Sequence, residues 1–165
     1  MGTPFSNFQI SAVKGCCLYP RRPVISQKRR SSDEEKAFKE LYEFVKAAEF
    51  DHLGAFVFSP EKGTPAARLP QRVHRKKAEE RLDAIMRLQA HISRKRNLSL
   101  VGRTVSVLVE GESPQTDLLL RGRTSTMAPE VDGQVLINKG VAEVGEIVPV
   151  LITKAHTYDL VGEIR

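Results

Sequence analysis

The fold of this chain is decided by residues 102–165, which read GRTVSVLVEGESPQTDLLLRGRTSTMAPEVDGQVLINKGVAEVGEIVPVLITKAHTYDLVGEIR. Short apolar runs recur in this stretch, and turn-forming residues separate them. The candidate strands cover residues 104–110, 117–124, 133–138, 147–155 and 157–164. Five short strands at this spacing predict an OB-like β-barrel, in which closure of the sheet removes exposed strand edges.

A long helix is predicted just before the barrel, over residues 73–97. Its inner face carries Ala78, Leu82, Ile85, Met86, Gln89 and Ile92 at helical spacing. Most of its cations lie outside that stripe, namely Lys76, Lys77, Arg81, Arg87, Arg94, Lys95 and Arg96. These cations fit either an ordinary solvent-exposed helix face or a patch that faces phosphate groups.

A helix and a strand are predicted further upstream. Ser32 followed by Glu35 fits a capping box at a helix N-terminus, and apolar residues continue at helical spacing to Ala48. The near-continuous apolar run from Leu53 to Phe58 predicts a strand covered on both faces. One such αβ unit cannot form a stable sheet by itself, so we expect the neighbours of this strand to be missing. The expected fold class is α+β.

The first 31 residues show no clear periodicity and contain three prolines and the basic run Lys28–Arg30. We expect a disordered or non-native leader there. The only two cysteines, Cys16 and Cys17, are adjacent, which suits neither a disulfide between them nor a metal site, so we expect free thiols and no metal. No apolar run has the length of a membrane span, and we expect a cytoplasmic protein with no membrane partner.

The positive charge of the chain lies outside the predicted barrel. Residues 1–97 hold 20 Lys and Arg against 11 Asp and Glu, a balance of +9, whereas residues 98–165 hold 6 against 9, a balance of −3. Basic charge commonly marks nucleic-acid binding, but here the barrel is acidic. The charge distribution therefore weakens the interpretation of the barrel as a basic RNA-binding module.

Three segments in order resemble the C-terminal part of the radical-SAM methylthiotransferase family. Residues 50–70 resemble the last strand and following loop of its catalytic domain, residues 80–93 its connecting helix, and residues 101–164 its TRAM domain. The segments Ala128–Gly133 and Tyr158–Glu163 are similar to the branch that methylthiolates an aspartate of a small-subunit ribosomal protein. The resemblance implies a leader over 1–31, the end of a radical-SAM TIM-like barrel over 32–97 and a TRAM domain over 98–165.

The resemblance also implies cofactors that this chain is not expected to hold. The intact family uses two [4Fe–4S] clusters and S-adenosyl-L-methionine, with one cluster on a C-x3-C-x2-C triad. Two adjacent cysteines match neither cluster, so we expect no cofactor, metal or catalytic residue in this chain. A truncated or frameshifted reading frame would account for this pattern.

Candidate substrate-binding residues come from two places. Ser59, Glu61 and Thr64 follow the predicted strand, where loops of a parallel α/β barrel face the active site. In the barrel, the candidates are Arg121, Arg123 and Lys139. By resemblance, the partner is a small-subunit ribosomal protein. A free-standing RNA-binding module, a tRNA-modifying relative and a non-functional product remain as alternatives.

Overall fold

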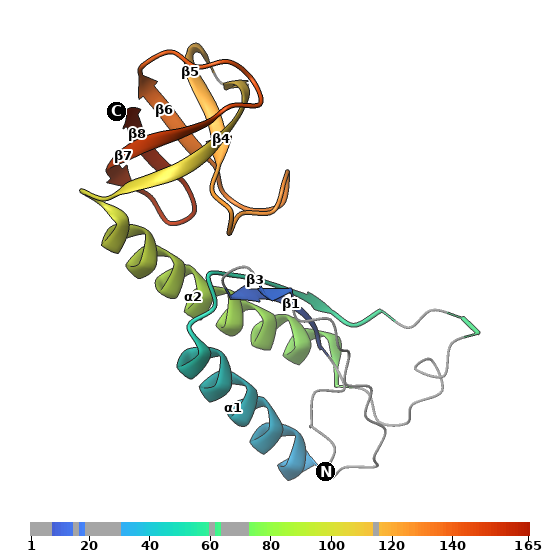
Figure 1. Cartoon of the computed structure of the whole chain (residues 1–165). Coiled ribbons are helices and arrows are strands. Elements are labelled where there is room, and N and C mark those ends of the chain that lie inside the picture. Colours follow the sequence, from blue (N-terminus) through green and yellow to red (C-terminus); the bar gives the residue numbers. More distant parts are fainter. Residues whose placement is uncertain (1–7, 15–16, 19–30, 60–61, 64–72, 114–115) are drawn as a thin grey trace.

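The computed structural model of the chain describes residues 8–14, 17–18, 31–59, 62–63, 73–113 and 116–165. Its described elements form two parts (Figure 1). One part holds two helices and a small sheet, and the other is a β-barrel that continues from the C-terminal end of the longer helix.

The first part contains helices α1 (Ser31–Ala48) and α2 (Arg75–Leu100). Its sheet has the order β2-β1-β3, formed by β1 (Phe8–Lys14), β2 (Cys17–Leu18) and β3 (His52–Val57). Both helices were predicted from apolar periodicity. Helix α2 continues past the predicted domain boundary at residue 97 to Leu100, and the division of the chain into three domains stays a prediction.

Strand β3 has a neighbour within this chain, which corrects the expectation that its neighbours are missing. Residues 52–57 pair antiparallel with residues 8–13 of β1, and β1 pairs with β2. Residues 8–14 and 17–18 therefore form strands inside the segment where we expected a disordered leader. An antiparallel partner needs no helical crossover, so a β1 segment distant in sequence can complete the sheet.

Only one face of β3 is covered in the described structure. Leu53 and Ala55 are buried, whereas the side chain of Phe56 is 62% exposed. The prediction of a strand buried on both faces was wrong, because a run of apolar residues does not by itself reveal how many layers cover it.

The core of this part lies between both helices and β3. Its buried apolar residues are Leu41, Val45, Leu53, Ala55, Ile85 and Ile92. These positions confirm the predicted inner faces of both helices. The start of α1 differs from the prediction, because the helix begins at Ser31 and Ser32 lies within its first turn. Glu35, which we expected to complete a capping box, contacts Lys77 and Arg81 of α2.

Arg81 links the two helices from a buried position. Its side chain is only 6% exposed, its Nη2 lies 3.0 Å from Oε2 of Glu35, and its guanidinium lies 5.2 Å from the ring centroid of Phe38. Lys77 Nζ reaches the same carboxylate oxygen at 2.7 Å. Arg81 thus belongs to the helix–helix interface, which corrects its expected place on an outer, cationic face.

The carboxylate of Glu35 should make stability depend on pH. Hydrogen bonds from Lys77 and then Arg81 hold the pKa of Glu35 below its usual 4.5. A lowered folded-state pKa contributes stability that is present above pH 4.5 and is lost as the pH falls through the folded-state value. We expect Glu35→Gln to lower the free energy of unfolding near neutral pH, and the difference from the unsubstituted chain to shrink in acid.

Urea unfolding over a series of pH values measures this difference. The control is Glu40→Gln, which removes one exposed carboxylate from the same helix. A Glu35→Gln effect that stays constant down to strongly acidic pH would contradict the proposed role of the Glu35 charge.

The second part confirms the predicted barrel. Its strands are β4 (Thr104–Ser113), β5 (Thr116–Arg123), β6 (Val135–Lys139), β7 (Ile147–Ala155) and β8 (Leu160–Ile164). They close in the order β4-β5-β6-β8-β7, with β6 and β8 parallel and the other neighbours antiparallel. The interior is filled by Val107, Val109, Met127, Val135, Ile137, Val150, Ile152 and Leu160.

Chain direction gives the barrel two distinct ends. We call the end that carries residues 124–134 and 156–159 the near end, because it faces α2 and β3 (Figure 1). We call the opposite end the far end; it carries the ends of β4 and β6, the start of β5 and the connection over residues 140–146. Each candidate site residue of the barrel can therefore be assigned to the end that faces α2 and β3 or to the opposite end.

Candidate substrate-docking site

The candidate residues after β3 are not assembled into a site by the described structure. Ser59 is exposed, and Glu61 and Thr64 lie outside the described residues. The reason for choosing them was their place in a parallel α/β barrel. The described neighbour of β3 is the antiparallel strand β1, so the structure adds no support for that place.

The two arginines of the barrel lie on β5, on either side of the buried Gly122. Arg123 donates from Nε to Oε1 of Glu110 at 2.7 Å and from Nη1 to the carbonyl oxygen of Met127 at 3.4 Å. Arg121 is half-buried, and its Nε is buried with no hydrogen-bond partner among the residues that the structure describes. Arg123 thus ties two strands and a loop together within the barrel.

The third candidate of the barrel, Lys139, lies at the other end of the structure from Arg123. Lys139 ends β6 at the far end, and its Nζ lies 3.9 Å from Oε2 of Glu163. Arg123 ends β5 at the near end. The structure therefore does not bring Arg121, Arg123 and Lys139 together into one phosphate-binding cluster.

Many cations of α2 pair with acids of the same chain. Besides the Glu35 pairs, Lys95 Nζ lies 2.7 Å from Oε1 of Glu49, and Arg87 Nη2 lies 3.1 Å from Oδ2 of Asp83. Arg96 pairs with Asp51, and its Nη1 donates to the carbonyl oxygen of Glu49. This pairing favours the interpretation of α2 as a structural helix over that of a phosphate-facing patch.

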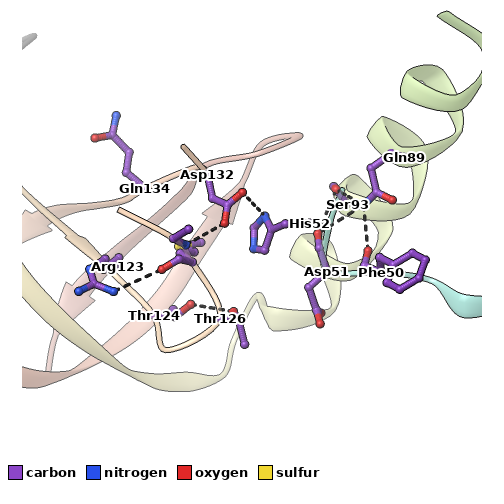
Figure 2. A network of polar contacts seen from close by, with 12 residues as sticks. Phe50, Asp51, His52, Gln89, Ser93, Arg123, Thr124, Thr126, Asp132 and Gln134 are labelled. Carbon is purple, nitrogen blue, oxygen red and sulfur yellow. Dashed lines mark hydrogen bonds and ion pairs between the residues drawn. The ribbon is translucent and has the colours of Figure 1, made fainter. Parts of the chain in front are cut away.

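The near end is joined to the first part by specific polar contacts, and Figure 2 shows the one between His52 and Asp132. His52 Nδ1, at the start of β3, lies 3.4 Å from Oδ1 of Asp132, and both side chains are mostly buried. The other oxygen of Asp132 accepts a 2.7 Å hydrogen bond from the backbone N–H of Ala128. Asn97 of α2 donates to the carbonyl oxygens of His156 and Thr157 at 3.3 and 3.2 Å. We call these contacts the junction.

A buried polar pair supports the β3 side of the junction. Gln89 Nε2 donates to the carbonyl oxygen of Phe50 at 2.9 Å and to Oγ of Ser93 at 3.0 Å (Figure 2). Gln89 was predicted to lie on the inner face of α2, whereas Ser93 and His52 were not predicted as functional residues. Ser93 lies four positions after Gln89 on the same face of the helix, and this spacing could have indicated that the two polar side chains are in contact.

A groove opens at the far end of the barrel. It has a volume of about 240 Å³, and its walls include Glu112, Leu119, Ile137, Lys139, Val141 and Ala142. Ala142 packs against the barrel core, while the neighbouring Val141 is 94% exposed. The connection over residues 140–146 thus closes the barrel interior with one side chain and presents another to the outside.

Among the described residues, no group of three or more His, Cys, Asp or Glu side chains could hold a metal ion. The same part of the chain has no helix that combines the length and the apolar composition required to cross a bilayer.

Both the barrel and the residues before it are similar to known proteins. The family model described as TRAM domain matches residues 101–164, the whole barrel. A ribosomal protein uS12 methylthiotransferase RimO from Pelobacter propionicus is 51% identical over 128 residues, which are 78% of this chain and 28% of the relative. RimO from Syntrophobacter fumaroxidans is also 51% identical, over 132 residues, or 80% of this chain and 30% of the relative. The chain matches the C-terminal region of RimO-type methylthiotransferases.

The RimO relatives confirm the resemblance drawn from the sequence and the branch assigned to it. RimO from Geobacter sulfurreducens is 48% identical over 132 residues, again 80% of this chain and 30% of the relative. The chain thus spans less than a third of the length of the RimO relatives that it matches. The TRAM assignment covers the acidic part of the chain, whereas the matches to RimO extend over about four fifths of it.

Proposed function

We propose that this chain provides the substrate-docking part of a RimO-like methylthiotransferase that acts on ribosomal protein uS12. The observation that carries the proposal is the match to RimO proteins at about half identity over four fifths of the chain. The acidic TRAM barrel supports it, because negative charge complements a basic ribosomal protein better than it complements an RNA backbone. Such a substrate would place the function in the cytoplasm.

The charges of the barrel residues favour a protein over RNA as the partner of this chain. The barrel segment has a balance of −3, and Arg123 is held by Glu110 rather than presented as an unpaired cation. Binding of an RNA backbone draws on several cations that neutralise phosphates together. Ser59, Glu61, Thr64, Arg121, Arg123 and Lys139 remain proposed contacts, among which Lys139 is the described residue at the far-end groove.

The residues of this chain do not fit the iron–sulfur clusters that the family resemblance implies. Three cysteine thiolates must converge on a cluster, and the chain has two cysteines at adjacent positions. We therefore assign no step of the radical chemistry to these residues. Their proposed role is to bind the ribosomal protein and to hold it at a defined orientation relative to α2 and β3 through the junction.

The proposal predicts that the purified full chain binds uS12 and discriminates against tRNA. We expect calorimetric titration to detect uS12 binding at both about 50 mM and about 200 mM salt, because apolar contacts persist when charge is screened. A tRNA contact made through phosphates would weaken by orders of magnitude over the same change in salt.

An unrelated acidic domain of similar charge, titrated with uS12, controls for unspecific attraction between opposite charges. Binding of tRNA with a steep salt dependence, together with no binding of uS12, would contradict the proposal and would support the RNA-binding alternative.

A further inference from the structure

The far end of the barrel presents exposed apolar side chains on the connection over residues 140–146 and at the start of β7. Val141, Val144 and Ile147 are 94%, 71% and 71% exposed. Clustered exposed aliphatic residues on a folded surface commonly mark an interaction site. Val141 is itself a wall of the groove that Leu119, Ile137 and Ala142 also line, and Val144 and Ile147 follow it at the same end of the barrel, where residues 140–146 run from β6 to β7.

Hydrogen bonds hold this connection in one conformation. Glu143 donates its backbone N–H to Oε2 of Glu146 at 2.9 Å, and Glu146 N–H donates to the Glu143 carbonyl oxygen at 3.2 Å. Gly145 N–H donates to the carbonyl oxygen of Val109 in β4 at 2.9 Å. A surface that is already ordered loses less conformational entropy when a partner binds.

Acidic side chains lie at the same end of the barrel as the apolar ones. Glu112 lines the groove, and Glu143 and Glu146 are exposed on the connection. Among the described residues, the cations at this end include Lys139, whose Nζ lies 3.9 Å from the Glu163 carboxylate, and Arg165, whose backbone N–H donates to the carbonyl oxygen of Pro149, so acids still outnumber cations there. The charge of this surface therefore favours a basic occupant and opposes the phosphates of RNA or of an anionic membrane.

We infer that the far end of the barrel is the docking surface for a basic polypeptide segment, which places an aliphatic side chain in the groove and cations near Glu112, Glu143 and Glu146. This inference rests on the proposed function and assigns the surface through which the chain contacts uS12. It also leaves the near end to the junction, so that docking and attachment to α2 use opposite ends of the barrel.

The test compares two matched double variants of the full chain in calorimetric titrations with uS12. Val141→Asn with Glu143→Lys changes one exposed aliphatic residue and one acid at the far end. Val131→Asn with Glu130→Lys makes the same changes at the near end, where Val131 is 83% exposed. All four residues are exposed, so we expect both variants to keep the thermal midpoint of the unsubstituted chain.

We expect the far-end variant to bind uS12 at least about tenfold more weakly and the near-end variant to stay within about twofold. Equal affinity of both variants would overturn the assignment of the far end while leaving the proposed function standing. No binding of uS12 by the unsubstituted chain would overturn both.

Other occupants of this surface give different results in the same series. Self-association of the free chain that the far-end variant abolishes, measured by sedimentation, would assign the surface to a second copy and overturn the inference. Binding of tRNA that the far-end variant strengthens, without binding of uS12, would show that the acids exclude RNA and would equally overturn a docking role for uS12.

Discussion

Replacing Ile152 by alanine should destabilise the barrel by about 2–5 kcal/mol. Ile152 is fully buried in the barrel interior, in the same apolar cluster as Val150. It is among the largest buried side chains of the described structure. Its backbone also joins the barrel to the end of α2, since Gly102 N–H donates to the Ile152 carbonyl oxygen at 2.8 Å and Ile152 N–H donates to that of Arg103 at 2.9 Å. The alanine side chain would leave a cavity in the barrel interior. The two hydrogen bonds hold the backbone of residue 152 in place, so the backbone cannot move inward to fill that cavity.

Ile147→Ala provides the matched control for this substitution. Ile147 lies on the same strand, but its side chain is 71% exposed, so we expect a change within about 0.5 kcal/mol. Urea unfolding followed by circular dichroism measures both variants. Equal destabilisation by the two substitutions would mean that the interior of the barrel is not packed around Ile152 as the structure has it.

Replacing Gly133 by alanine should cost about 1–3 kcal/mol and disturb the junction. A Cβ atom at this position would lie 2.0 Å from the carbonyl oxygen of Tyr158 and 2.5 Å from its carbonyl carbon. These are backbone atoms of the turn over residues 156–159, whose carbonyl oxygens accept the hydrogen bonds of Asn97. The turn must therefore move for the methyl group to fit, and the movement should weaken the contact with α2.

Two measurements test the Gly133 prediction. Urea unfolding reports the loss of stability, and the NMR signals of the Asn97 side-chain amide report the junction. The control is Gly54→Ala, because a Cβ at Gly54 would have its nearest neighbour, Cε2 of Phe56, at 3.9 Å. Unchanged stability and unchanged Asn97 signals in Gly133→Ala would show that the turn adapts without loss.

Local sequence patterns were enough to predict most of the helices and strands of this fold. The start of β4 at Thr104 and both bounds of β7 agree with the predicted strands, because alternating apolar residues and turn residues define them. The inner face of α2 was predictable for Ile85, Gln89 and Ile92 for the same reason. The partner of β3 was not predictable, because strand pairing across a separation of about 40 residues depends on contacts that leave no local periodicity.

The candidate site was predicted less well than the fold. Charge and residue type pointed to Arg121, Arg123 and Lys139, but they could not reveal that Arg123 is bound to Glu110 or that Lys139 lies at the opposite end of the barrel. The junction residues His52 and Asp132 are 80 positions apart in the chain, and nothing in either local sequence indicates the other.

The sequence by itself determined the barrel, the two helices and the relation to RimO-type proteins, because periodicity and motif order are properties of neighbouring residues. Tertiary structure alone decided which ends of the barrel are available. Packing of the near end against α2 and β3 occupies Asn97, His52 and Asp132 and leaves Val131 exposed beside them, whereas the far end has no such contacts with α2 or β3 among the described residues. Which surface is covered depends on how distant segments fold together, and that information appears only once the chain is folded.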